Sequence, residues 1–594
     1  MKLPSLSFLA QAFIAACVRF PATMFCAFTG VAAVMILIEN RGGGDGDPLV
    51  KVWMMAQIGL ALCTAFTVLA ESRGWNRLRN WGLQALALAL LIAYYFVFDL
   101  KAQGLERIHL PRYVALLAVA HLAVAFAPYL NRWPVADFWE FNKRLFANFI
   151  VGAVYSAILF SGLALAILAI NELFNLGIDE KIYAHLFVLL AGIFNTAFFL
   201  YHFPAAFEFD EQEKAYNVVF KNLCQYILIP IVGLYFLILY AYSVKILLTW
   251  TLPKGWVASL VLGFSVAGIF TYLINYMLPN QTDSKTVHAY RRWFWWVLLP
   301  MVGLLFVAIA RRIADYGITE ERFFVAHAGV WLLVVCGYFL WSKSDNIKFI
   351  PISLSAFVLI AVLGPFSAFE VARRNQVAIL HRLLTENDRF EGGKLKQGGA
   401  PVPQEVASRI FSCLVFLEQR GDLSELDSWF PVPLEQIAPG QEEKYSTART
   451  DSIAHWLQIN DGVFGLKHNR FVAVYPSNSK QFSGDISGFR RFFRLELYEL
   501  GRRKDSKSRV FLSEKGDAII LMSADDKTVA DSFSLVPSMR QWAVAPEAYY
   551  DLQDSVRVIN LRGKNSVARL FVQEARLDAT ELKMQNLNGV LFLK

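Results

Sequence analysis

Charged residues are scarce in this chain. Of its 594 residues only 18% are Asp, Glu, Lys or Arg, whereas 56% are hydrophobic. Soluble domains usually contain about 45–50% apolar residues and about a quarter charged ones. The apolar excess is concentrated in the first two-thirds of the sequence. This composition excludes an ordinary soluble protein and predicts a multi-pass membrane protein with a soluble C-terminal part.

Motifs for catalysis and for cofactors are missing as well. The sequence has no P-loop, no HExxH, no dinucleotide fingerprint and no nucleophile elbow. Its six cysteines include no pair at zinc-site spacing. We therefore expect no cofactor, and the sequence favours, without deciding, a protein that is not an enzyme. The weak metal candidates are Asp45 and Asp47, because two carboxylates one residue apart can share a divalent cation.

The positive net charge does not form a nucleic-acid footprint. The formal charge is +8, and most of it lies before Asn375, beside the apolar segments. Nucleic-acid binding would need a basic face on a folded domain, and the C-terminal part has none of that size. Lys and Arg beside apolar segments instead set the orientation of membrane helices. We therefore expect membrane lipids as partners and no nucleic acid, and another membrane or envelope protein is a second candidate partner.

Long apolar segments dominate the first two-thirds of the chain. Roughly 20 apolar residues are needed to cross a bilayer as a helix, and we find about eleven candidates. Their approximate ranges are 21–38, 53–70, 81–98, 113–130, 145–170, 182–201, 223–248, 256–278, 294–310, 323–341 and 349–371. All are predicted to be helices, because a helix satisfies its backbone polar groups within one segment.

The pattern of the sequence divides the chain into three parts. Residues 1–20 have apolar residues every three to four positions, which predicts an amphipathic helix in the membrane interface. Residues 21–372 form the predicted multi-pass helical domain. Residues 373–594 start with a helical linker and continue with short runs rich in β-forming residues. The predicted fold class is therefore a polytopic α-helical membrane protein of about 11 transmembrane helices with a C-terminal soluble α+β domain.

The distribution of Lys and Arg predicts the orientation. The loops predicted to lie on the same side of the membrane as the N-terminus hold more Lys and Arg than the loops on the other side. The positive-inside rule then places the N-terminus in the cytoplasm, and an odd number of spans places the C-terminal domain in the periplasm. Arg373 and Arg374, directly after the last span, favour the opposite side for that domain.

Several segments together resemble a known family. They are "FWEFNKRLFANFIVGAVYSAILFSGLALAI" (138–167), "YHFPAAFE" (201–208), the polar stretch "RRIADYGITEERFF" (311–324), "RRNQVAILHRLLTEND" (373–388) and the final "GVLFLK". This set is similar to a family of bacterial multi-pass inner-membrane proteins defined only as a domain of unknown function, four-one-five-three. The resemblance covers most of the chain. It implies a bacterial inner (cytoplasmic) membrane location and supplies no reaction, substrate or cofactor.

The polar stretch at 311–324 has two interpretations. As a turn between two helices, Gly317 ends the first helix, and Thr319 caps the second with Glu320 and Glu321 in its first turn. As a site for a ligand or a partner, Arg311, Asp315, Tyr316 and Arg322 form one polar cluster at the membrane surface that can hold an anionic group.

Polar residues within the predicted spans are the remaining candidates. His121, Asn195 and Asn275 lie inside apolar segments, where polar groups are often functional but also join helices by hydrogen bonds. The leading hypothesis is a non-enzymatic envelope protein that binds a lipid, an apolar solute or a partner protein. A transporter or flippase is the first alternative, with a cavity lined by His121, Asn195 or Asn275. A lipid-linked glycosyltransferase that uses Asp45 and Asp47 is the second.

Overall fold

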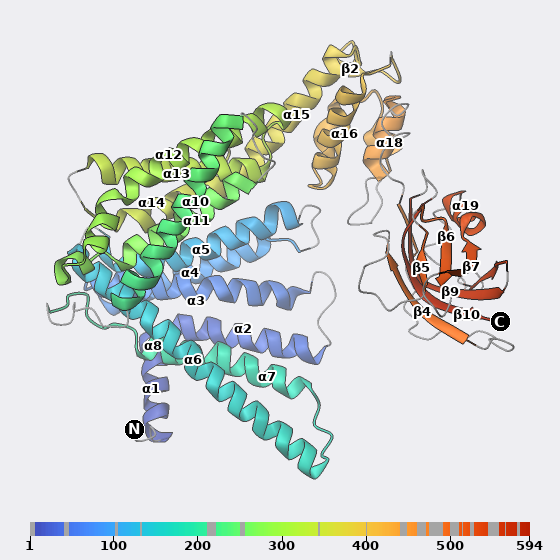
Figure 1. Ribbon diagram of the computed structural model, residues 1–594. Helices are drawn as coiled ribbons and strands as arrows, with labels where there is room; N and C mark the ends of the chain where they lie inside the picture. The colour runs from blue at the N-terminus through green and yellow to red at the C-terminus, as the bar shows by residue number, and fades with distance from the viewer. Residues whose placement is uncertain are drawn as a thin grey trace. The chain divides into compact units, whose positions relative to one another are not determined.

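The chain folds into two compact units. The first contains Met1–Lys396 and Arg409–Ile453, and the second contains Gln397–Ser408 and Ala454–Lys594. Figure 1 shows the computed structural model. It describes residues 6–594 except 41–46, 101–104, 131–133, 211–220, 250–255, 343–344, 400, 440–447, 460–470, 475–490, 499–509, 514, 523–527, 545–557, 565 and 579–582. Asp45 lies outside the described residues.

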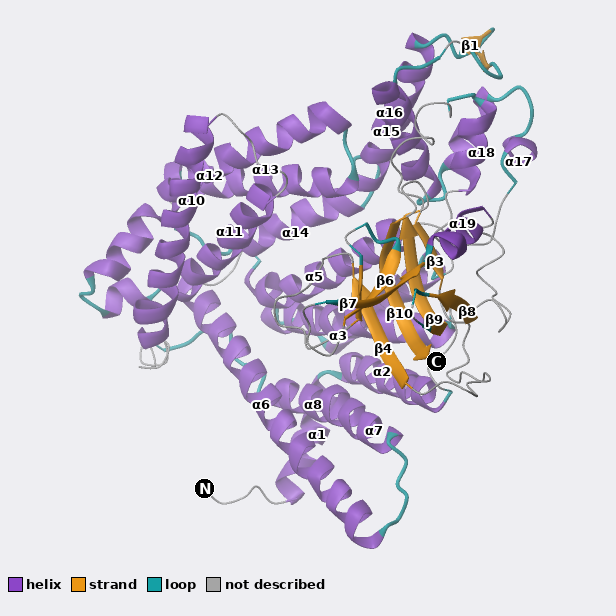
Figure 2. Ribbon diagram, turned by 45° about the vertical axis from the view of Figure 1, so that its right-hand side comes forward, coloured by secondary structure: helices purple, strands orange, loops and turns teal. Residues whose placement is uncertain are grey.

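The first unit is a bundle of helices. Its helices through the last apolar segment are α1 (Leu6–Arg19), α2 (Pro21–Glu39), α3 (Pro48–Ser72), α4 (Arg77–Val97), α5 (Leu110–Phe126), α6 (Val135–Phe174), α7 (Lys181–Leu189), α8 (Asn195–Tyr201), α10 (Ile229–Thr249), α11 (Trp256–Ile274), α12 (Lys285–Tyr316), α13 (Glu320–Trp341) and α14 (Phe349–Val362). Short π-helical turns precede α5, α8 and α10, at Leu105–His109, Leu190–Phe194 and Leu223–Leu228. Figure 2 shows that helix is the dominant structure of this unit.

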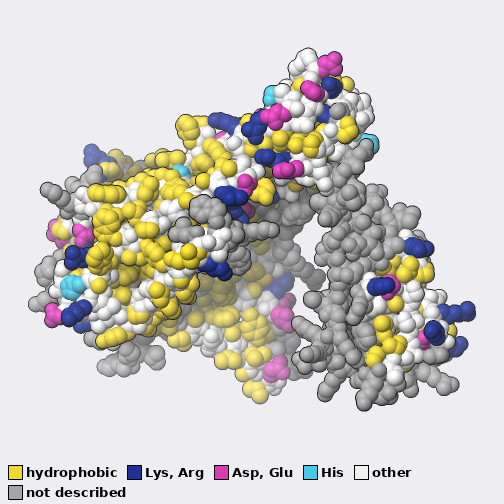
Figure 3. All heavy atoms as spheres, turned by 45° about the horizontal axis from the view of Figure 1, so that its top comes forward, with side chains coloured by type: hydrophobic (Ala, Val, Ile, Leu, Met, Phe, Trp, Pro, Cys, Tyr) yellow, Lys and Arg dark blue, Asp and Glu magenta, His cyan; other side chains and the backbone are white. Residues whose placement is uncertain are grey.

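Ten helical segments among the described residues are long and apolar enough to cross a membrane. They overlap the first ten predicted spans, so the prediction of a multi-pass helical membrane protein is confirmed. Figure 3 shows hydrophobic side chains over much of the bundle surface in view, with charged side chains gathered toward its margins. Such a surface is suited to lipid rather than to water.

The structure differs from the prediction at the eleventh segment. The predicted span 349–371 is divided into α14, which is 14 residues long, and a separate helix that starts at Ala368. Gly364 lies between them with φ +74°, and Pro365 follows it directly. A left-handed residue ends a helix, and the residue before a proline disfavours the helical conformation. α14 is therefore shorter than each of the ten segments that are long enough to cross a membrane.

Contacts between helix ends define two ends of the bundle. At end A, the Arg19 guanidinium donates to the Glu71 carboxylate and to the Phe203 carbonyl, which joins the ends of α1, α3 and α8. The Trp139 indole N–H at the start of α6 donates to the Leu273 carbonyl near the end of α11, at 2.9 Å. At the opposite end, which we call end B, α5 and α13 begin and α12 and α14 end. There Arg112 of α5 donates to the Val362 carbonyl at the end of α14, and Phe324 of α13 packs in the same cluster as Val362.

Two helices follow the apolar segments, and the first unit contains all of the first helix and the second from Arg409 onward. They are α15 (Ala368–Glu386) and α16 (Gln404–Glu418), and the tiny hairpin of β1 (Phe390–Glu391) and β2 (Lys394–Leu395) lies between them. The short helices α17 (Leu434–Ile437) and α18 (Ala448–Trp456) come later. α15 packs against α13 and α14 at end B.

The second unit is built from antiparallel sheets, which confirms the predicted α+β character of the C-terminal part. Its strands are β3 (Phe471–Val474), β4 (Arg491–Tyr498), β5 (Val510–Leu512), β6 (Ala518–Met522), β7 (Val529–Ser534), β8 (Val558–Arg562), β9 (Val567–Asp578) and β10 (Lys583–Leu593). A five-stranded sheet has the order β3-β9-β10-β4, with β8 also paired to β9, and β5-β6-β7 form a three-stranded sheet. Helix α19 (Val536–Val544) follows β7.

Candidate functional site

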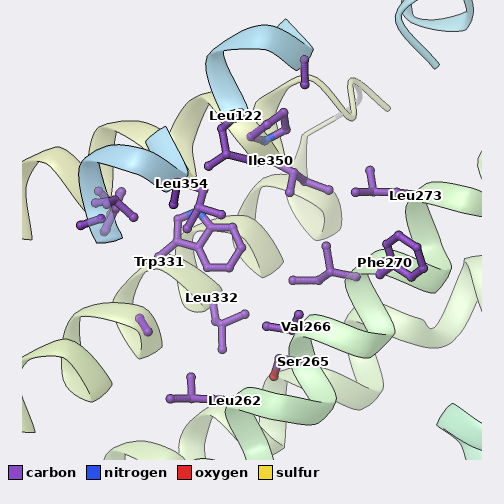
Figure 4. A pocket seen from close by; sticks show the side chains of 18 of the residues that line it. Leu122, Leu262, Ser265, Val266, Phe270, Leu273, Trp331, Leu332, Ile350 and Leu354 are labelled. Atoms are coloured by element: carbon purple, nitrogen blue, oxygen red, sulfur yellow. The ribbon is translucent and has the colours of Figure 1, made fainter. Parts of the chain in front are cut away.

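A large apolar cavity lies between the helices of the first unit. α5, the start of α6, α11, α13 and α14 line this partly open cavity, which has a volume of about 1040 Å³. Figure 4 shows side chains from α5, α11, α13 and α14 that surround this space. Those labelled are Leu122, Leu262, Ser265, Val266, Phe270, Leu273, Trp331, Leu332, Ile350 and Leu354. Pockets for small molecules usually measure about 300–1,000 Å³, so this cavity can hold a large ligand.

The cavity extends along the bundle from one end to the other. Its lining includes Trp139 and Lys143 at end A and Leu110 and Val362 at end B. The side chains between these ends are almost all aliphatic or aromatic. An elongated hydrocarbon chain would therefore bury its surface along most of the cavity.

Most polar groups in the cavity wall already have hydrogen-bond partners. The Trp331 indole N–H donates to the Ser353 hydroxyl at 3.0 Å, and the Ser265 hydroxyl donates to a carbonyl of its own helix at 2.6 Å. The Asn142 amide nitrogen donates to two carbonyls, one of them on α5. The wall is thus apolar in effect although it contains polar side chains.

Charged side chains meet the cavity at end A. Lys143 lines the cavity, and its ammonium group forms an ion pair with Glu140 at 2.5 Å. The same carboxylate pairs with Arg144 at 2.9 Å, and Glu140 is buried. The Lys143 ammonium also lies 4.8 Å from the centre of a Trp139 ring. A cation is attracted to the face of an indole, and Trp is frequent at membrane–water interfaces.

At end B the cavity wall is continuous with the packing around α15. Phe324 and Val362 line the cavity and also belong to the apolar cluster that contains Phe369 of α15. The rings of Phe324 and Phe369 meet edge to face with centroids 6.0 Å apart. The guanidinium of Arg112 lies over the Phe369 ring and donates to the Val362 carbonyl. Residues of the cavity wall thus hold the first turn of α15.

The polar stretch 311–322 contains the end of α12, the turn at residues 317–319 and the start of α13. Gly317 has φ +77°, and its N–H donates to the Ile313 carbonyl, so it ends α12 as predicted. Arg322 donates to the Gly317 carbonyl at 2.8 Å, and its guanidinium lies 5.4 Å from the Tyr316 ring centre. Arg311 and Asp315 are exposed and 3.9 Å apart. The structure thus brings Tyr316 and Arg322 together and leaves Arg311 and Asp315 as a separate pair.

This turn is attached to α15 by hydrogen bonds. The Asn375 side-chain oxygen accepts from the Ile318 N–H at 2.7 Å. The Gln376 side-chain nitrogen donates to the carbonyls of Tyr316 and Ile318, at 3.3 and 3.1 Å. The turn therefore has a binding partner within the same chain. Whether its four candidate residues also bind an external ligand or protein stays a prediction.

The first turn of α13 departs from the predicted cap. Thr319 occupies the N-cap position, but its side chain makes no capping hydrogen bond. Glu320, expected to face the helix end, is buried and forms an ion pair with Arg420. Arg420 follows α16, so this contact was outside the reach of local sequence patterns.

The three polar candidates inside the predicted spans are not among the residues that line the cavity. His121 is exposed on α5, and its Nδ1 lies 2.8 Å from the Leu117 carbonyl. Asn195 begins α8 and lies close to Gly152 of α6. Asn275 is fully buried, and neither atom of its amide has a hydrogen-bond partner among the described residues.

Asp47 has a structural role in the described part of the chain. Its carboxylate accepts the N–H of Leu49 at 2.8 Å and caps α3. The described residues contain no group of three or more His, Cys, Asp or Glu side chains that could hold a metal ion.

Comparison with known proteins identifies the family. The family described as "Domain of unknown function (DUF4153)" matches residues 25–385. This chain belongs to that family. An uncharacterised protein of Pasteurella multocida (strain Pm70) is 25% identical over 372 residues, which cover 57% of this chain and 60% of that relative. The match thus spans less than two-thirds of the relative's length. No solved structure matches the chain.

Within this DUF4153 member, two of the segments that carried the resemblance meet at end A. Phe141 of α6 packs edge to face against Phe203, with centroids 5.6 Å apart, and lies 6.1 Å from Phe207. The Tyr129 hydroxyl donates to the Phe207 carbonyl at 3.1 Å. The loop after α8 is therefore fixed to the start of α6, next to the charged end of the cavity.

The sequence analysis did not select His327, which is a cavity residue. His327 of α13 lines the cavity, and it lies inside a predicted span. The criterion that selected His121, an ionisable side chain within an apolar segment, applies equally to His327.

Proposed function

We propose that this protein is a bacterial inner-membrane protein without enzymatic activity that holds the hydrocarbon part of a membrane lipid in the cavity. The cavity between α5, α11, α13 and α14 carries this proposal, because its wall is apolar and it extends from one end of the bundle to the other. A hydrocarbon chain gains about 25 cal/mol for each Å² that it removes from water. Within a bilayer this gain is absent, so fit to the wall would decide which lipid is retained.

The inner-membrane location draws on the architecture and the family. Outer-membrane proteins are typically β-barrels, whereas the membrane-like part of this chain is helical.

We further propose a cytoplasmic N-terminus and a periplasmic C-terminal domain. Arg19, Arg73 and Lys143 at end A support this orientation through the rule that places basic residues on the cytoplasmic side. Arg112 and Arg322 at end B favour the reverse orientation, as do Arg373 and Arg374. A reporter fused to Lys594 would be active in the periplasm under this proposal and active in the cytoplasm if the orientation is reversed.

The alternatives gain no support from the described residues. A transporter with a path lined by His121, Asn195 or Asn275 would need these side chains in the cavity, and its lining contains none of them. A glycosyltransferase would use Asp45 and Asp47 together, and the Asp47 carboxylate caps α3.

Retention of lipid by the purified protein tests the proposal. Ala328 of α13 lines the cavity, so Ala328→Trp fills space that a ligand would occupy. Overpacking costs about 1–3 kcal/mol, which predicts at least about a fivefold loss of bound lipid in native mass spectra. Ala166→Trp is the matched control, because Ala166 is exposed on α6 and does not line the cavity. Equal retention by the two variants, or no lipid on the wild type, would overturn the proposal.

A further inference from the structure

The cavity wall has a shortage of free hydrogen-bond donors. The indole N–H groups of Trp139 and Trp331 and the hydroxyl of Ser265 each donate to an oxygen of the protein. The Asn142 amide nitrogen donates to two carbonyls. Lys143 is the cation among the described lining residues, and it is paired with Glu140. Away from end A, a ligand group that accepts hydrogen bonds would therefore find few free donors in the cavity wall.

His327 offers an acceptor in this wall. Its Nε2 lies 2.8 Å from the Phe357 carbonyl, and a carbonyl oxygen can only accept a hydrogen bond, so Nε2 carries the proton. In the uncharged ring Nδ1 is then an acceptor. No hydrogen bond to Nδ1 is present among the described residues.

The ring of His327 packs against two aromatic rings. It stacks on Phe323, with an angle of 14° and centroids 5.4 Å apart, and it lies 5.0 Å from the Phe357 ring. The hydrogen bond of Nε2 opposes a 180° rotation of the ring, because that rotation would place Cε1 instead of Nε2 against the Phe357 carbonyl. The Nδ1 acceptor of His327 is therefore preorganised. His327 lies about 10 Å along α13 from Glu320, given the rise of 1.5 Å per residue in an α-helix.

We propose that the ligand of the cavity is a long-chain apolar molecule with a hydroxyl group that donates a hydrogen bond to Nδ1 of His327. This inference rests on the proposed function, since it assumes that the cavity holds a hydrocarbon chain. It specifies the chemical class as an alcohol or a hydroxylated lipid, rather than a hydrocarbon with acceptor groups only. An ether or ester oxygen at the same place would face the Nδ1 lone pair and would be repelled.

Two matched probes test the hydroxyl. Hexadecanol and methyl hexadecyl ether have the same hydrocarbon chain, and only the alcohol can donate. Competition against tritiated hexadecanol in detergent at pH 8 gives the affinity ratio of the two probes. One hydrogen bond contributes about 0.5–1.5 kcal/mol. The wild type should therefore prefer the alcohol by about two- to tenfold, relative to the partitioning of the two probes into protein-free detergent.

Two substitutions distinguish the role of Nδ1 of His327 from that of Nε2. In His327→Asn the side-chain oxygen can occupy the position of Nδ1, so the preference for the alcohol should remain. In His327→Gln the amide group reaches the position of Nε2 and the acceptor next to Cγ is lost, so the preference should fall to that of detergent alone. A merely structural role for the imidazole would weaken the binding of both probes equally.

Each outcome bears on a different statement. Equal affinity of the wild type for the two probes would contradict the proposal that the ligand has a hydroxyl group. The proposed lipid-binding function would then stand. A preference that persists in His327→Gln would overturn the role of His327. If neither probe binds the wild type, the proposed function itself fails.

Discussion

Arg420 and Glu320 form a buried ion pair that joins the segment after α16 to the first turn of α13. The Arg420 guanidinium also donates to the Asp422 carboxylate at 2.6 Å and to the Phe369 carbonyl of α15 at 3.1 Å. One side chain thereby connects an apolar helix with both helices that follow the apolar segments. α15 and α16 are therefore fixed to end B of the bundle rather than linked to it by a free tether.

Removal of the arginine should destabilise this junction. In Arg420→Met, the buried Glu320 carboxylate loses its cation, and breaking a buried pair in this way typically costs about 3–5 kcal/mol. We expect a lower thermal unfolding midpoint in detergent and faster hydrogen exchange in α15. The double variant Glu320→Gln with Arg420→Met leaves no buried charge unpaired and should recover part of the loss. A midpoint for Arg420→Met equal to that of the wild type would contradict this prediction.

The turn at Gly317 should tolerate no larger residue. A Cβ atom at Gly317 would lie 2.3 Å from the Ile379 side chain and 2.8 Å from the Asn375 side-chain oxygen, and φ there is +77°. Gly317→Ala should therefore push the turn away from α15 and lower stability by more than about 1 kcal/mol. Gly303→Ala, inside α12 with no neighbouring atom within 4 Å, is the control. Thermal unfolding of the two variants side by side measures the difference.

Local patterns in the sequence accounted for the helices better than for their contacts. Ten apolar runs predicted helical spans because about 20 apolar residues in succession have few other stable states in lipid. Gly317 was predicted to end a helix because glycine adopts positive φ without strain. The division after α14 was missed, although Gly364 and Pro365 stand next to each other there. The prediction of one span over residues 349–371 used only length and hydropathy, and neither quantity reports a break in a helix.

The candidate site depends on contacts that hydropathy does not encode. Glu320 and Arg420 are separated by 100 positions, so no local pattern pairs them. The cavity requires five segments to pack without filling the space between them, which depends on side-chain volumes in three dimensions. His327 could have been found, because an ionisable side chain in an apolar segment is costly without a partner. Its partner, the Phe357 carbonyl, belongs to another helix.

The thiol of Cys413 should report whether α15 and α16 are docked. Burial raises the pKa of Cys413 to about 11, and its S–H donates to the Gln376 side-chain oxygen at 3.3 Å. Because the thiolate is the reactive form, alkylation at pH 8 should be slow and should accelerate about tenfold per pH unit up to about pH 11. Gly317→Ala, which loosens α15, should speed the reaction at pH 8. Peptide mapping by mass spectrometry distinguishes Cys413 from the other five cysteines.

Asn275 provides a test of whether its amide has a function. It is fully buried, and neither amide atom has a partner among the described residues. An unsatisfied buried amide costs about 1–3 kcal/mol, so Asn275→Leu, with a similar volume, should leave the unfolding midpoint unchanged or raise it. Asn275→Asp is the contrasting variant and should lower it, because a carboxylate there would be buried without a cation. A clear loss of stability in Asn275→Leu would mean that the amide holds a water molecule or a ligand in the membrane, and the transporter alternative would then regain a polar group inside the bundle.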